Sequence, residues 1–196
     1  MQLPELPPKN LWELTVEDLL GPARARVAGS KTRSMQTSQS HANPSSESLH
    51  EASHAIVAAA MGIREISVIT SSGKFRASLK QGKLWAQLVS SFAGCIGDRL
   101  ISGLPDEVCR LRSTSDRIIR ESMRADVRKD LDWTELCQGA ENLASSLIED
   151  LQSEIIEFAS VLEPFFVARR DFTAERVEGL PCIQKARSHG ALVGLH

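Results

Sequence analysis

The sequence His-Glu-Ala-Ser-His at residues 50–54 constrains this chain more than any other feature. It fits the pattern His-Glu-x-x-His and lies in a segment whose apolar residues recur at helical spacing. Four residues make just over one helical turn, so we expect His50 and His54 on one face of a helix. Two imidazoles placed in this way can hold one zinc ion, and Glu51 can take a proton from a water on that metal.

A second interpretation of the same residues is a helix with two partly exposed histidines and a solvated glutamate, because short motifs also arise by chance. The context supports the helix itself. Asn43-Pro44 offers a capping residue followed by a proline suited to the first helical position, and Met61-Gly62 offers a glycine stop. The chain has only five histidines in 196 residues, and two of them lie in this motif. We therefore favour the metal site.

The third ligand must come from elsewhere, because Val57 and Ala60 stand where an extended His-x-x-Gly-x-x-His motif would place its glycine and histidine. Several carboxylates on predicted helices are candidates, and spacing alone does not choose among them: Asp98, Glu107, Asp116 and Glu121.

The length and composition predict one domain with two loosely structured ends. We expect a flexible arm over residues 1–42, the domain over residues 43–181 and a tail over residues 182–196. Residues 11–20 could form a short amphipathic helix, which either packs on the domain surface or serves as a docking peptide for a partner. A net charge of -2 provides no overall field that selects nucleic acid or a membrane surface.

The compartment is inferred from the cysteines and from the absence of targeting signals. The four cysteines are widely spaced without a Cys-x-x-Cys pair, which argues against a zinc ribbon or a disulfide framework. The sequence contains no apolar run of membrane-spanning length and no signal-peptide pattern. We expect a cytoplasmic protein that does not insert into a membrane.

The remaining pattern predicts a mainly α (α+β) fold with a small β-hairpin or sheet beside the metal helix. Residues 65–69 and 75–80 read as two strands, and the edge at residues 66–69 could bind an extended peptide or simply pack on helices. A helix is expected over residues 83–102. Its small residues would let another helix approach closely: Ser90, Ala93, Gly94 and Gly97.

A further helix is expected from Ser113 to about Asp126, where Ser113 and Asp116 fit a capping box. Asp116 therefore has two possible roles, as a capping residue and as a metal ligand. The same helix carries a basic stripe that could be a solvated face or a contact for an acidic partner, a subunit or nucleic acid: Arg117, Arg120, Arg124 and Arg128.

The C-terminal part also reads as helical. One long apolar stripe runs from Leu143 to Leu162, and Pro164 is expected to break or kink its helix. A last short helix is expected after Thr173 as its cap.

Four segments together resemble the peptidase domain of the FtsH-type ATP-dependent zinc metalloproteases. Residues 50–57 are similar to the family's His-Glu-Ala-Gly-His-Ala-hydrophobic-Val, and residues 93–103 resemble its Gly-Gly-Arg-Ala-Ala-Glu-Glu helix. Ser-Thr-Ser-Asp at residues 113–116 resembles the family's Gly-Ala-Ser-Asn-Asp, and residues 171–175 resemble its Glu-Thr-Leu-Thr-x-Glu. The resemblance covers roughly residues 50–180. It implies that His50, His54 and Asp116 bind zinc and that Glu51 is the general base.

The chain departs from that family in lacking the ATPase module, since no Gly-x-x-x-x-Gly-Lys-Ser/Thr loop occurs. Ser53 replaces the motif glycine, Cys95 an arginine and Asp98 a glutamate. We therefore expect a stand-alone, ATP-independent zinc metalloendopeptidase acting on peptides or unfolded segments. Two assemblies are compatible with the sequence, a homo-oligomer and a complex with a separate ATPase. The alternatives are a catalytically silent zinc-containing module that binds peptides or regulates another protein and, more weakly, nucleic-acid binding through the basic stripe.

Overall fold

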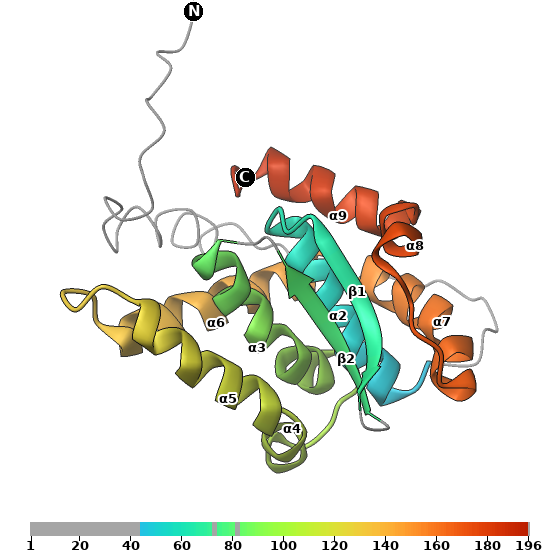
Figure 1. Ribbon diagram of the computed structural model, residues 1–196, viewed down its shortest axis with the longest axis horizontal. Helices are drawn as coiled ribbons and strands as arrows, with labels where there is room; N and C mark the ends of the chain where they lie inside the picture. Colours follow the sequence, from blue (N-terminus) through green and yellow to red (C-terminus); the bar gives the residue numbers. More distant parts are fainter. Residues whose placement is uncertain (1–43, 72–73, 81–82, 196) are drawn as a thin grey trace, which may run out of the picture.

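The structure is a computed structural model that describes residues 44–71, 74–80 and 83–195 (Figure 1). Over these residues the chain is mainly helical with one β-hairpin, as the sequence predicted. The arm over residues 1–42, its candidate helix at residues 11–20 and Asn43 lie outside the described residues.

Helix α2 (Ser46–Ala60) is the helix around which the others pack, and it carries both histidines of the motif. Thirteen of its fifteen residues are buried, because α3, α7, α9 and the hairpin all contact it. Ser45, two residues after the expected Asn43, is its N-cap and accepts a hydrogen bond from the Ser48 amide at 3.2 Å. The helix ends at Met61 and Gly62, where Gly62 has φ 77°, so the predicted glycine stop is confirmed.

The predicted hairpin is also confirmed. Strand β1 (Glu65–Ser71) pairs antiparallel with β2 (Lys74–Lys80) in a register from Glu65↔Lys80 to Ser71↔Lys74. The other edge of β1 is bonded to the chain's own backbone, since Val68 and Phe172 exchange hydrogen bonds of 2.9 and 2.7 Å. The edge at residues 66–69, for which the sequence left open both peptide binding and plain packing, is thus occupied at its centre by the chain itself. Within the described residues, β2 has β1 as its one strand neighbour.

Helix α3 (Leu84–Leu100) packs against α2 through the small residues that the sequence singled out. A Cβ atom built on Gly94 would lie 2.4 Å from His54 Nε2 and 2.5 Å from His50 Nε2. A Cβ atom on Gly97 would lie 2.0 Å from Ser53 Oγ and 2.8 Å from Ser53 Cβ. The absence of side chains at Gly94 and Gly97 lets α3 approach the metal helix closely, as predicted.

We expect Gly97→Ala to lower the free energy of unfolding by about 1–3 kcal/mol, because the added methyl group overlaps Ser53 on a buried helix. Ser53→Gly removes both atoms that the methyl group would meet, so the double variant should recover part of the loss. Urea unfolding of the wild type, both single variants and the double variant measures this coupling. If the double variant is as unstable as the two single losses added together, the close contact does not explain the glycine.

Two short helices follow α3. We predicted no bounds for α4 (Asp106–Arg112), although Glu107, which it carries, was counted among the helical carboxylates. Helix α5 (Thr114–Met123) and the 3₁₀ turn η2 (Arg124–Asp126) cover the helix that we expected from Ser113 to Asp126. The expected capping box is not formed. The Ser113 hydroxyl donates to the Cys109 carbonyl at 2.7 Å, and no side chain caps α5. This leaves the carboxylate of Asp116 to face α2.

The long apolar stripe is divided between α6 (Trp133–Asp150) and α7 (Gln152–Ala168). The helix is interrupted at Leu151, which has φ -112° and ψ 21°, and not at Pro164, which lies inside α7 without ending it. Helix α8 (Ala174–Glu178) follows Thr173 as predicted, although the Thr173 side chain makes no capping hydrogen bond.

The C-terminus differs from the tail that we expected. Residues Pro181–Leu192 form helix α9, with proline at its first position, and it packs on α2 and α7. Its buried residues are few and mostly small, namely Cys182, Ile183, Ala186 and Gly190. Such a short apolar pattern gives only a weak helical signal in the sequence. Within the described residues, no helix has the length and apolar character needed to span a membrane.

Candidate metal centre

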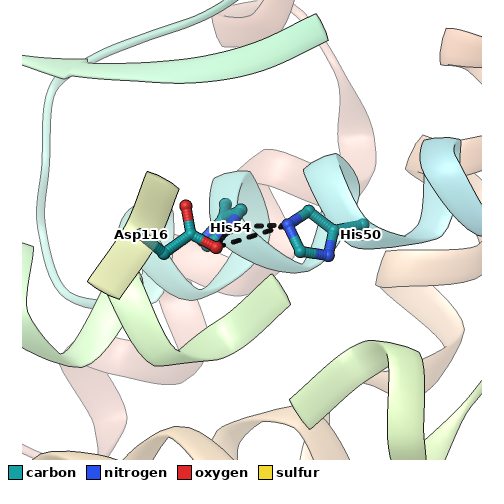
Figure 2. A group of neighbouring side chains, drawn as sticks. All are labelled: His50, His54 and Asp116. Carbon is teal, nitrogen blue, oxygen red and sulfur yellow. Dashed lines mark hydrogen bonds and ion pairs between the residues drawn. The ribbon is translucent and has the colours of Figure 1, made fainter. Parts of the chain in front are cut away.

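Three side chains from two helices converge on one point (Figure 2). His50 and His54 come from successive turns of α2, and Asp116 reaches toward both of them from α5 (Figure 2). The Nε2 atoms of the two histidines are 3.2 Å apart, and Asp116 Oδ2 lies 3.5 Å from His50 Nε2 and 3.4 Å from His54 Nε2. Both histidines are buried, and Asp116 is half-buried.

The size of this triangle matches the ligands of one small cation. Ligand atoms that lie about 2.0–2.1 Å from zinc at tetrahedral angles are about 3.3 Å from one another. The three observed separations of 3.2, 3.4 and 3.5 Å fall around that value. Asp116 Oδ2 is also buried, and its contacts with the two Nε2 atoms, at 3.4 and 3.5 Å, are longer than ordinary hydrogen bonds. The group can therefore hold a metal ion through these three atoms.

The far side of each imidazole is bound to an acceptor that fixes the ring. Asp98 Oδ2 lies 2.8 Å from His50 Nδ1, and the Ser90 carbonyl lies 2.7 Å from His54 Nδ1. Protons on both Nδ1 atoms satisfy these contacts and leave both Nε2 lone pairs directed at the site. Such outer partners set the orientation and basicity of histidine ligands. The sequence indicated neither contact.

The structure distinguishes the four carboxylates that the sequence left open as the third ligand, because they lie in different places. Asp116 lies at the site. Asp98 is buried and contacts the outer nitrogen of His50, so it supports a ligand and is not one itself. Glu107 and Glu121 are exposed on the surface.

Removing Asp98 is expected to weaken metal binding without removing a ligand. Outer partners of histidine ligands contribute about 10–100-fold to metal affinity, so Asp98→Ala should raise the dissociation constant by that factor. Asp98→Asn, which keeps an oxygen that can accept from His50, should lose less. Competition with a chromophoric chelator measures both values. If Asp98→Ala binds the metal as tightly as the wild type does, the contact between Asp98 and His50 does not affect metal affinity.

Helix α5 is held in place by Arg120, a member of the predicted basic stripe. Its Nη1 atom donates to the Ser91 carbonyl at 2.7 Å, and its guanidinium lies 4.1 Å from the centre of the Phe92 ring. Arg117 and Arg124 are exposed, and Arg128 is exposed and bonded to Asp130. The four arginines therefore do not form one solvated stripe, because Arg120 is bound to α3 and holds the ligand helix against it.

Glu51 is buried next to the two histidines, where the motif places it. Its negative charge contributes to the raised pKa of both His50 and His54. The candidate base and the three candidate ligands thus lie in one site. His189 lies apart from it, with Nε2 3.4 Å from Asp150.

Without a bound metal ion, His50, His54 and Asp116 have pKa values far from the usual ones. Burial lowers the pKa of His50, but hydrogen bonds to Asp116 and Asp98 and the charge of Glu51 outweigh it and raise that pKa to about 10. For His54, burial is outweighed by the charge of Asp116 and a hydrogen bond to it, so its pKa is raised too. Burial raises the pKa of Asp116, but the charges and hydrogen bonds of the two histidines hold it well below its usual range.

These shifts predict a steep pH dependence of metal affinity. A metal ion must displace the protons of His50 and His54, so affinity should rise about tenfold per pH unit for each protonated histidine, up to the raised pKa. The rise should continue from pH 7 toward pH 9, whereas histidines with an ordinary pKa of about 6.5 would give a nearly constant affinity there. Metal titrations at several pH values measure the slope. A flat profile above pH 7 would contradict the raised pKa values.

Comparisons with models of known protein families, with curated proteins and with solved structures found no match.

Proposed function

We propose that this protein is a zinc metallopeptidase that hydrolyses peptide bonds in peptides or unfolded protein segments. The observation that supports this most is the triangle of His50, His54 and Asp116 atoms, whose edges suit zinc, with Glu51 buried beside it. The resemblance of residues 50–180 to the FtsH-type peptidase domain points to the same residues in the same roles.

Each residue has a distinct part in the proposed reaction. His50, His54 and Asp116 would hold the ion, which when bound supplies a Lewis acid that polarises a carbonyl and acidifies water. Glu51 would accept a proton from the attacking water and then donate it to the leaving amine. Asp98 and the Ser90 carbonyl keep the two imidazoles turned toward the site.

The proposed substrate is an extended backbone, and β2 is the strand that offers it an edge. Strand β2 contacts α2 and, among the described residues, pairs only with β1. A peptide could add to this edge through main-chain hydrogen bonds. The edge at residues 66–69, which the sequence left open as a possible peptide site, is less suitable, because Phe172 bonds to it at Val68.

The test is cleavage of an unfolded protein such as casein by the zinc-loaded chain, without ATP. We expect fragments that grow with time, loss of cleavage after a chelator removes the metal, and recovery when zinc is added back. A zinc-loaded protein that cleaves neither casein nor a mixed peptide library would contradict the peptidase. It would favour the catalytically silent peptide-binding module.

A further inference from the structure

The two oxygens of the Asp98 carboxylate have different surroundings. Asp98 lies on α3 and is fully buried. Its Oδ2 atom is 2.8 Å from His50 Nδ1, on the side of the imidazole away from the candidate metal site. Among the described residues, its Oδ1 atom has no hydrogen-bond partner. Because a buried carboxylate costs free energy unless its charge is compensated, this position calls for a cation beside Oδ1.

The cation beside Oδ1 is Arg112 of α4. Its Nη1 atom lies 3.5 Å from Asp98 Oδ1, which is within the range of an ion pair but longer than an ordinary hydrogen bond. The same Nη1 atom donates to the hydroxyl of Ser46, the first residue of α2, at 2.9 Å. The Arg112 side chain is 22% exposed, so salt and water screen this pair less than a pair on the open surface. Asp98 is thus held between the imidazole of His50 and a guanidinium.

These contacts run in one line from α4 through α3 to the site on α2. Arg112 contacts Asp98, Asp98 contacts the outer nitrogen of His50, and the inner nitrogen of His50 faces the candidate metal position. The orientation of the Asp98 carboxylate decides where Oδ2 points, and Oδ2 in turn fixes the ring of His50. Arg112 is not one of the three candidate ligands, so its influence on ligand orientation passes through Asp98.

We propose that Arg112 is a positioning residue of the metal centre, which holds Asp98 in the orientation that fixes His50 as a ligand. The inference rests on the proposed zinc site and gives a role to α4, a helix that contributes none of the three candidate ligands. The direction of the effect is informative. A nearby cation repels a metal ion, so the loss of Arg112 would tighten metal binding if charge alone mattered. Weaker binding after its removal therefore indicates positioning.

The zinc affinity of the full chain, measured by competition with a chromophoric chelator, tests the proposal. Arg112→Ala should raise the dissociation constant by about three- to tenfold, which is less than the loss of Asp98 costs, because Arg112 is one contact further from the ion. Arg112→Lys keeps a cation and should retain most of the affinity. In an Asp98→Ala background, Arg112→Ala should have no further effect, because the contact through which it acts is already absent.

Two controls separate positioning from a general effect of α4. Arg110→Ala removes an exposed arginine from the same helix and should leave the zinc affinity unchanged. Ser46→Ala removes the other hydrogen bond of Arg112 Nη1, by which α4 is anchored to α2, and should leave the affinity unchanged as well. All variants should keep the circular dichroism spectrum of the wild type.

NMR of the zinc-loaded protein gives a second readout, which an anchoring role alone would not change. The proton on His50 Nδ1 should exchange with water faster in Arg112→Ala than in the wild type, whereas Arg110→Ala should not alter its exchange. The proposal is overturned if Arg112→Ala binds zinc as tightly as the wild type or more tightly, or if Ser46→Ala reproduces its loss of affinity. A wild type that binds no zinc would overturn the metal site as well. Neither measurement requires peptide hydrolysis, so both results hold whether or not the zinc-loaded chain cleaves casein.

Discussion

Glu51→Gln is expected to abolish peptide hydrolysis while leaving the metal in place. Glutamine keeps the size of the side chain but cannot accept the proton of the attacking water. General base catalysis contributes about 10²–10⁴-fold, so cleavage of casein should fall by that factor or more. The three candidate ligand atoms come from other residues, so we expect the variant to bind as much zinc as the wild type, one ion per chain. Cleavage rates and metal content are measured on the same samples.

The matched control for this variant is Glu47→Gln. Glu47 is an exposed carboxylate on the same helix, one turn before Glu51, so it tests the loss of a charge from α2 without touching the site. It should retain wild-type cleavage. A Glu51→Gln variant that cleaves as fast as the wild type would remove Glu51 from the reaction and leave only a metal-binding helix pair.

Asp116→Ala is expected to cost more metal affinity than any change outside the ligand triangle. It removes one of three ligand atoms and the negative charge that offsets the ion. Because outer partners alone contribute about 10–100-fold, loss of a direct ligand should raise the dissociation constant by more than about 100-fold. Cleavage should be lost with the metal, and high zinc concentrations should restore only part of either.

Glu121→Ala is the control for the third ligand. Glu121 lies on the same helix, but its side chain is exposed, so its removal should leave metal binding unchanged. The pair also discriminates between the two carboxylates of α5 that the sequence left open. If Asp116→Ala bound zinc as tightly as the wild type, the assignment of the third ligand would be wrong.

The sequence was sufficient to predict the parts of the site that follow from local spacing. The spacing of four residues from His50 to His54 places both on one helical face, and the structure has their Nε2 atoms 3.2 Å apart. The glycines of α3 were correctly predicted to allow close packing, because Gly94 and Gly97 face His54 and Ser53. The hairpin was predicted from the two strand-like segments at residues 65–69 and 75–80, and the structure pairs β1 and β2 antiparallel.

Other parts depend on contacts between distant residues, which spacing does not fix. Asp116 fitted a capping box equally well, and only the packing of α5 on α3 turns it toward the histidines. Asp98 had the residue type of a ligand, but its place on α3 puts it behind His50. Helix α9 was missed because a few small buried residues give little periodicity, whereas its packing on α2 and α7 stabilises it.

The measurement that tests the central claim most directly is the metal content of the purified chain. The protein is prepared without chelator, supplied with zinc, freed of excess metal and measured by elemental analysis. We predict one zinc ion per chain in the wild type and much less in a His50→Ala/His54→Ala variant that retains its helical content. A wild-type protein without bound metal, or a variant that keeps its zinc, would contradict the assignment of His50, His54 and Asp116 as the metal site.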